Sequence, residues 1–147
     1  MTMLPETPLG VLQPEAEETV SLSGKLALVT GSTSGIGLSI ARALAVAGTH
    51  VALNGFGDKA QVDRLVAEFR TKYKVKVDYS AADMSKPAEI AAMVEQVARE
   101  LGRVDILVNN AGIQHVAPVE EFPLEKWDAV IATSRPRFSP SAPPCHT

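Results

Sequence analysis

Three glycines, Gly31, Gly35 and Gly37, stand where a short apolar run gives way to apolar residues at helical spacing. A glycine-rich turn between a strand and a helix lets backbone N–H groups at the helix N-terminus approach a phosphate. The spacing is not Gly-x-Gly-x-x-Gly, and no Lys-Ser or Lys-Thr pair follows, which argues against a mononucleotide P-loop. A simple turn is the alternative, but the strand–helix context favours a dinucleotide's pyrophosphate. The residues expected at the cofactor are Gly31, Thr33, Ser34, Gly35, Ile36 and Gly37.

A second candidate segment, Asn109-Asn110-Ala111-Gly112, follows another apolar run. Ligands of open α/β sheets collect beyond the carboxyl ends of the strands, and small residues there leave room for a flat cofactor. Asn side chains also close turns by bonding the backbone, so a purely structural role is the alternative.

The elements that must position these segments alternate along the chain. Short apolar runs predict strands, and apolar residues at helical spacing predict the helices between them. Gly48 and Gly102 suit helix ends, while Ser85 and Pro87 suit a helix start. The predicted strands cover residues 26–29, 50–54, 75–80 and 105–109. The apolar faces predicted for the three helices between them are, for the first helix, Ile36, Ile40, Ala43, Leu44 and Ala47; for the second, Val62, Leu65, Val66 and Phe69; and for the third, Ile90, Met93, Val94, Val97 and Leu101.

Strands that alternate with helices indicate an α/β fold, because right-handed crossovers produce a parallel sheet covered on both faces. Four strands are roughly half of a doubly wound sheet. We therefore expect the N-terminal half of a doubly wound Rossmann-type parallel sheet, truncated after its fourth strand. The outer edge of that strand would be bare and apolar, which invites aggregation. A last helix is predicted to begin within residues 124–131.

Composition limits the class of protein. The chain has 147 residues, 46% hydrophobic and 21% charged, which suits one globular domain with a core. A net charge of −3 with no basic cluster excludes a typical nucleic-acid binder. No apolar run predicts a membrane helix, and the N-terminus lacks a secretion or transit pattern. The single Cys145 fits a reducing compartment, so we expect a cytoplasmic protein, and we predict no metal site.

Three segments are expected along the chain. Residues 1–23 hold four glutamates, three prolines and no Lys or Arg, and are interpreted as a flexible acidic leader. Residues 24–132 form a nucleotide-binding half-domain. Residues 133–147 are rich in proline and are interpreted as a disordered tail.

The loop from Thr30 to Gly37 and the Asn109–Gly112 segment, about 80 residues later, together resemble the short-chain dehydrogenase/reductase family. The resemblance covers residues 24–132. Segments 53–58, 82–87 and 109–116 narrow it to the bacterial D-3-hydroxybutyrate dehydrogenases within that family. It implies a Rossmann fold and a nicotinamide cofactor.

The same resemblance implies roles for individual residues. Asp83 would bond the adenine amino group, although a role at a helix start is the alternative, and Met84 would line the adenine pocket. Asn110, Ala111 and Gly112 would flank the cofactor. Gln114 would help to hold a substrate carboxylate, or would be an exposed loop residue, and His115 is interpreted as a surface histidine.

The choice between NAD and NADP depends on the end of the second strand, where an acid bonds the ribose 2′-hydroxyl and an arginine accepts a 2′-phosphate. Asn54, Gly55 and Phe56 are neutral and Asp58 is nearby, while the phosphate loop carries no Arg or Lys. We therefore expect NAD rather than NADP, with Phe56 among the cofactor contacts.

No catalytic residue is predicted in this chain. Members of the family move the hydroxyl proton with a Tyr whose pKa is lowered by a Lys four residues later, assisted by a Ser and an Asn. The chain has only Tyr73 and Tyr79, and Val77 and Asp83 stand four residues beyond them. Because proton transfer is typically worth about 10²- to 10⁴-fold, we expect essentially no turnover.

The tail suggests a cause for this gap. The family expects Asn-Leu-Ser shortly after Ala132, whereas this chain reads Thr133-Ser134-Arg135-Pro136. Codons for these four residues, read one base earlier, can spell Asn-Leu-Ser-Ala. Our hypothesis is a frameshift in the gene or its sequencing, and a gene sequence that restores no family-like frame, with its Tyr and Lys, would refute it.

These observations predict a truncated NAD-dependent oxidoreductase whose full-length relative interconverts 3-hydroxybutyrate and acetoacetate. One alternative is a nucleotide-binding or interaction module without catalysis. Another is a fragment of a reductase for a different hydroxy or keto substrate. The predicted partners are a small-molecule substrate in the full-length relative, with no nucleic acid and no membrane, and the family's oligomer interface is expected to be lost.

Overall fold

The computed structural model describes residues 21–134 of the chain. The acidic leader and the proline-rich tail proposed above therefore lie almost entirely outside the described residues. The elements in chain order are β1 (Leu26–Val29), α1 (Gly35–Val46), β2 (His50–Asn54), α2 (Lys59–Lys72), β3 (Val77–Ser80), α3 (Pro87–Glu100), β4 (Ile106–Val108), the 3₁₀ turn η1 (Val119–Glu121) and α4 (Leu124–Ser134).

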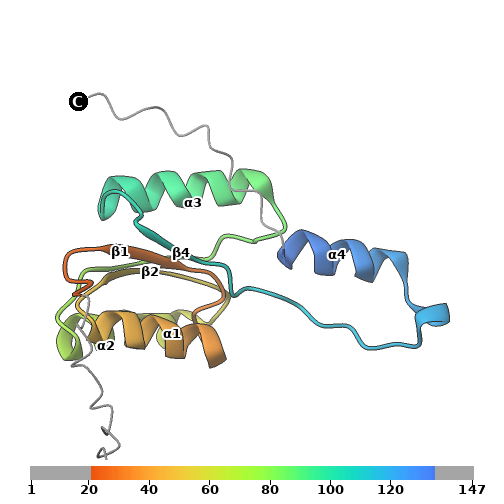
Figure 1. Ribbon diagram of the computed structural model, residues 1–147, viewed down its shortest axis with the longest axis horizontal. Coiled ribbons are helices and arrows are strands. Elements are labelled where there is room, and N and C mark those ends of the chain that lie inside the picture. Colours follow the sequence, from red (N-terminus) through yellow and green to blue (C-terminus); the bar gives the residue numbers. More distant parts are fainter. Residues whose placement is uncertain (1–20, 135–147) are drawn as a thin grey trace, which may run out of the picture.

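All four strands form one parallel sheet in the order β3-β2-β1-β4. After β3 the chain crosses to the far side of β1, so the direction of winding reverses between β1 and β4. Helices α1 and α2 cover one face of the sheet and α3 covers the other (Figure 1). The expected half of a doubly wound α/β sheet is confirmed.

Strand β1 lies at the centre of the core, and its four residues are at most 2% exposed. On one face Val29, Val51 and Leu53 pack with Phe69 of α2. On the other face Leu26, Leu28 and Ala52 pack with α3, whose buried side chains are Ile90, Met93 and Val97. The predicted faces of the second and third helices are thus confirmed.

The predicted face of the first helix is only partly right: Ile40 and Leu44 pack against the core, but Ile36 does not. The buried residues of α1 are Gly37, Ala41 and Ala45, whereas Ile36 is 75% exposed. At Gly37 this burial follows from close packing, because a Cβ there would overlap the Gly31 carbonyl oxygen and the Asn110 amide. Ile40 and Leu44 pack only at the margins of the core.

Two strands are shorter than predicted. Strand β3 begins at Val77 rather than residue 75, because Lys74 adopts a left-handed backbone conformation (φ 57°) that closes α2. Strand β4 covers three residues, and the Asp105 carboxylate accepts the Leu26 N–H at 3.0 Å beside it.

The outer edge of β4 pairs with no strand among residues 21–134, as expected, and Leu107 on that strand is 41% exposed. Beyond β4 the chain leaves the sheet, and α4 stands apart from it (Figure 1). Helix α4 extends to Ser134, two residues past the predicted domain boundary. Within the described part of the chain, no helix is long and apolar enough to cross a membrane. The large apolar side chains exposed beyond β4 are Ile113, Val116, Val119, Leu124, Trp127 and Ile131.

We expect Phe69→Ala to destabilise the fold severely. The ring is fully buried between α2 and the sheet, and removing a buried Phe typically costs about 3–5 kcal/mol, a large part of a domain's stability. Urea denaturation followed by circular dichroism would measure the loss. Val46→Ala, at a 73% exposed helical position, is the matched control and should change the free energy of unfolding by less than about 0.5 kcal/mol. If the two variants were equally stable, the burial of Phe69 in this core would be wrong.

Candidate functional site

The glycine loop ends at the N-terminus of α1. Gly31 and Gly35 both adopt left-handed backbone conformations, with φ of 63° and 56°, which only glycine adopts without strain. Ser34 is the N-cap but its side chain makes no capping bond, and Ser34, Gly35 and Ile36 are exposed. A Cβ at Gly35 would meet nothing within 4 Å, so open space lies beside the helix terminus. The loop therefore presents N–H groups to an approaching anion.

Gly37 permits close contact between α1 and the loop. A Cβ at this position would overlap the Gly31 carbonyl oxygen and the Asn110 side-chain amide. A side chain at Gly37 would therefore push α1 away from the loop.

Thr30 and Asn110 join the ends of β1 and β4. The Asn110 side-chain Nδ2 donates to the carbonyls of Thr30 and Gly31 at 3.0 and 3.1 Å. In return, the buried Thr30 hydroxyl accepts the backbone N–H groups of Asn110 and Ala111, both at 3.0 Å. The two segments predicted from sequence thus form one site. The Asn110 side chain bonds backbone, so its contribution to a ligand is the position of the loop.

Asn54, at the end of β2, joins the other side of the loop to the segment after β3. Its Oδ1 accepts the Gly31 N–H at 3.3 Å, and its Nδ2 donates to the carbonyls of Ser80 and Ala82 at 3.2 and 2.9 Å. The side chain is 1% exposed. This role of Asn54 was not predicted from the sequence, where only its neutrality was considered; an amide at the end of an apolar run was the available signal.

The turn after β2 is held by two hydroxyl groups. Thr33 donates from Oγ1 to the Phe56 carbonyl at 2.8 Å, and Tyr79 donates to the Gly55 carbonyl at 2.7 Å. Burial raises the pKa of the Tyr79 hydroxyl. The Phe56 side chain is 72% exposed at the rim, and Asp58 caps α2 by accepting the Gln61 N–H. Phe56 therefore offers an apolar surface beside the loop, and Asp58 already has a structural partner.

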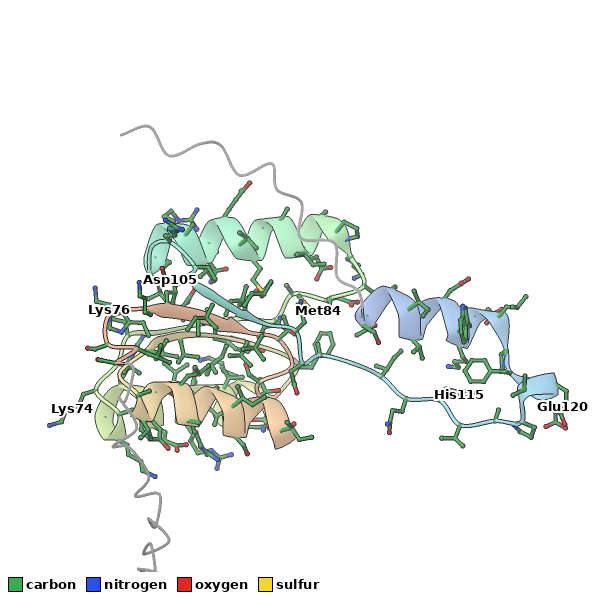
Figure 2. The ribbon with its side chains drawn as sticks, viewed as in Figure 1. Lys74, Lys76, Met84, Asp105, His115 and Glu120 are labelled. Atoms are coloured by element: carbon green, nitrogen blue, oxygen red, sulfur yellow. The ribbon has the colours of Figure 1, made fainter. Side chains whose placement is uncertain are left out.

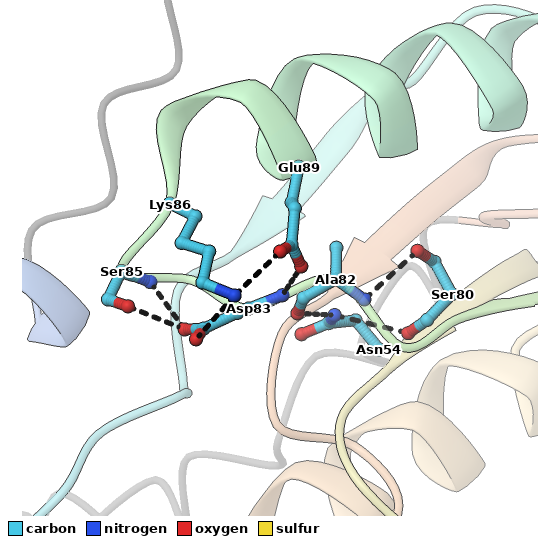
Figure 3. Close-up of polar contacts among 7 residues, drawn as sticks. All are labelled: Asn54, Ser80, Ala82, Asp83, Ser85, Lys86 and Glu89. Atoms are coloured by element: carbon cyan, nitrogen blue, oxygen red, sulfur yellow. Dashed lines mark hydrogen bonds and ion pairs between the residues drawn. The ribbon is translucent and has the colours of Figure 1, made fainter.

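Asp83 lies just after β3, at the same edge of the sheet (Figure 3), and Met84 is the next residue. The Asp83 Oδ1 accepts the Ser85 N–H at 2.9 Å and the Ser85 hydroxyl at 2.7 Å. This is the helix-start arrangement given above as the alternative. Met84 points into the core beneath α3 (Figure 2), where it packs with Leu26 and Ile90 and is 5% exposed. Little of the Met84 side chain is left to line an adenine pocket.

Charges around Asp83 are balanced locally. The pKa of Asp83 is lowered chiefly by the backbone and hydroxyl hydrogen bonds from Ser85. The pKa of Glu89 is lowered chiefly by the Asp83 N–H, and the pKa of Lys86 is raised by its contact with Glu89. Both carboxylates are therefore ionised at neutral pH, beside a positively charged Lys86.

Residues after Asn110 leave the sheet. Ala111 is half-buried, whereas Gly112 and Gln114 are exposed. His115 lies on the outgoing segment (Figure 2) and packs edge-on against Phe122, with ring centroids 5.2 Å apart. Gln114 thus occupies an exposed loop, the alternative given for it above.

The opposite edge of the sheet holds a hollow of about 560 Å³ that contains none of the predicted site residues. Lys74 and Lys76 lie there (Figure 2), on the amino side of β3. Among residues 21–134 no group of three or more His, Cys, Asp or Glu side chains could hold a metal ion.

A family model described as short chain dehydrogenase matches residues 25–135. Two D-beta-hydroxybutyrate dehydrogenases are similar in sequence: the protein from Cupriavidus necator is 55% identical over 111 residues, and that from Rhizobium meliloti is 50% identical over 110 residues. These matches cover 76% and 75% of this chain but only 42% and 43% of the relatives. The chain thus spans less than half of the length of these relatives.

Solved structures agree on the fold. A blue fluorescent protein from a metagenomic library, in complex with NADPH, superposes with a TM-score of 0.72 at 36% identity, covering 77% of this chain and 46% of that one. The L-sorbose reductase from Gluconobacter frateurii, complexed with NADPH and L-sorbose, has a TM-score of 0.69 at 38% identity, with coverages of 74% and 41%.

We expect Gly37→Ala to destabilise the chain by about 2 kcal/mol or more, because the added methyl group would collide with a backbone oxygen that cannot move freely. Urea denaturation would measure the loss. Gly112→Ala is the control, since a Cβ there meets nothing within 4 Å. If Gly37→Ala unfolded at the same urea concentration as the unmodified protein, the close contact assigned to Gly37 would be wrong.

Asn54→Asp should cost about 1–3 kcal/mol at neutral pH, since a carboxylate would replace the amide that donates to Ser80 and Ala82. Asn109→Asp, at an exposed position, should be nearly neutral. Thermal unfolding of both variants would test the bonding assigned to Asn54. If Asn54→Asp were as stable as Asn109→Asp, that bonding would be wrong.

Proposed function

Since the chain belongs to the short-chain dehydrogenase family, whose model matches residues 25–135, we propose that the carboxyl edge of its sheet binds a nicotinamide dinucleotide. The observation that carries the proposal is the open N-terminus of α1, held against β4 by the bonds between Thr30 and Asn110. The pyrophosphate lies at Ser34, Gly35 and Ile36, where helix N–H groups are exposed.

The adenosine half extends from the loop toward the ends of β2 and β3. Phe56 covers it at the rim, and Asp83 accepts the adenine amino group through Oδ2, which has only the Lys86 ammonium nearby, at 3.8 Å. Met84 contributes by anchoring Asp83 through its buried side chain. Ala111 and Gly112 leave space for the remainder of the cofactor.

The cofactor is NAD rather than NADP. Residues 54–58 contain no Lys or Arg, and Asp58 would repel a 2′-phosphate. The exposed Lys59 at the start of α2 already pairs with Asp63, at 2.7 Å. The two structural neighbours described above contain NADPH, so the preference is a property proposed for this chain's own β2 turn.

The similarity to two D-beta-hydroxybutyrate dehydrogenases supports interconversion of 3-hydroxybutyrate and acetoacetate as the reaction of the full-length relative, with Gln114 near the substrate carboxylate. The 147-residue chain itself is inactive, because neither Tyr73 nor Tyr79 has a lysine four residues later. We also propose a change of reading frame near residue 133, because the sequence departs there from the Asn-Leu-Ser expected after Ala132. Resequencing the gene across codon 133 tests that origin.

A binding or interaction module without catalysis is the second candidate. It is favoured by the unpaired outer edge of β4 and the exposed apolar side chains from Ile113 to Ile131. Such a module would bind NAD saturably but would not oxidise 3-hydroxybutyrate. The inactive fragment proposed above would behave in the same way in both assays. Restored downstream coding sequence would favour the fragment, and a genuine stop codon would favour the module.

Calorimetric titration of the 147-residue chain with NAD and with NADP tests the binding proposal. We expect saturable NAD binding and at least tenfold weaker NADP binding. Asn110→Ala should weaken NAD binding by tenfold or more, because the loop loses two hydrogen bonds from the side chain. Asn109→Ala, one residue earlier and exposed, is the matched control and should bind like the unmodified chain. Absence of NAD binding by folded protein would overturn the proposal.

A further inference from the structure

Glu89 makes an unusual contact at the start of α3. The helix has Lys86 as its N-cap and Glu89 at its third position. An acid at that position commonly accepts the N–H of the N-cap residue itself. Here the Lys86 N–H donates to the Asp83 carbonyl at 3.0 Å, and Glu89 instead accepts the Asp83 N–H, through Oε2 at 2.8 Å (Figure 3).

The residues on either side of Asp83 are held by other contacts. Asn54 donates to the Ala82 carbonyl at 2.9 Å, and Met84 is buried in the core. Ser85 occupies one oxygen of the Asp83 carboxylate. The Asp83 N–H itself is held by the Glu89 side chain, which comes from α3.

The two carboxylate oxygens of Asp83 have different partners. Oδ1 accepts two hydrogen bonds from Ser85, whereas Oδ2 has the Lys86 ammonium at 3.8 Å. Lys86 lies closer to Glu89, 2.9 Å from its Oε1. The Glu89 carboxylate therefore holds both the backbone of Asp83 and the cation beside it, which leaves Oδ2 accessible to an N–H donor.

We propose that Glu89 is a positioning residue for recognition of the adenine amino group: by accepting the Asp83 N–H it fixes the direction of Asp83 Oδ2. This role rests on the proposed function, because Asp83 must face an adenine. Glu89 itself touches no cofactor atom. Its role is to align one hydrogen-bond acceptor, the Oδ2 atom of Asp83.

Two conservative variants separate the effect of the length of the Glu89 side chain from the effect of its charge. Glu89→Asp keeps the negative charge in the first turn of α3 but shortens the side chain by one methylene, so it no longer reaches the Asp83 N–H. Glu89→Gln keeps the length and an acceptor oxygen but removes the charge. Glu95→Asp, the same change at an exposed position of the same helix, is the control.

The readout is the affinity of the 147-residue chain for NAD and for nicotinamide hypoxanthine dinucleotide, which has an oxygen in place of the adenine amino group. The unmodified chain and Glu95→Asp should prefer NAD by about tenfold to a hundredfold, the worth of one hydrogen bond to a charged group. Glu89→Gln should retain part of that preference, because its amide oxygen still accepts the Asp83 N–H but the neutral side chain no longer pairs with Lys86. Glu89→Asp should lose most of that preference through weaker NAD binding, with affinity for the hypoxanthine dinucleotide unchanged.

The outcomes separate the two proposals. If the unmodified chain prefers NAD and Glu89→Asp retains that preference, the positioning role is wrong although cofactor binding stands. If Glu89→Asp weakens both dinucleotides equally, Glu89 has only a structural role, which also overturns the inference. If the folded chain binds neither dinucleotide, the proposed function fails, and the role of Glu89 fails with it.

Discussion

Contact between the glycine loop and the end of β4 is the constraint on which the rest of the candidate site depends. Helix α1 approaches the loop closely because Gly37 has no side chain, and the space a Cβ would take is occupied by a backbone oxygen and the Asn110 amide. Asn110 and Thr30 then exchange hydrogen bonds in both directions. Because β1 and β4 are the strands between which the winding reverses, this contact lies where ligands of doubly wound sheets collect.

Polar side chains around this edge are largely committed to the protein's own backbone. The Asn54 side chain bonds three backbone groups, Thr33 holds the β2 turn, and Asp58 caps α2. A ligand at the loop would therefore meet backbone N–H groups and small residues in place of cationic side chains. Affinity for an anion would then depend on the helix N-terminus and on the rigidity of the loop. Asp83 is the exception, since within residues 21–134 its Oδ2 accepts no hydrogen bond and has the Lys86 ammonium 3.8 Å away.

Beyond β4 the chain has a different physical character. Its apolar side chains from Val116 to Leu124 are largely exposed, and α4 buries none of its residues. Exposed apolar surface of this kind favours association, as does an unpaired strand edge. Residues 21–110, in contrast, have a buried hydrophobic cluster on each face of the sheet. Cofactor binding at the carboxyl edge of the sheet can thus be considered separately from the dehydrogenase reaction of the relatives, which are about twice as long as this chain.

The amino-acid sequence by itself determined the type and order of the elements, because hydrophobic periodicity and glycine or proline at helix ends act within a few residues. It also brought the two site segments to one sheet edge, since parallel strands share their carboxyl ends. The tertiary structure decided which face of α1 is fully buried, namely that of Gly37, Ala41 and Ala45, because Gly37 must lie against the Gly31 backbone and the Asn110 amide. It likewise decided the partners of Asn54, Asn110 and Glu89, which lie 23, 79 and 6 residues away in the chain. A side chain's hydrogen-bonding capacity is local, but the group that satisfies it depends on which strand ends and loops pack together.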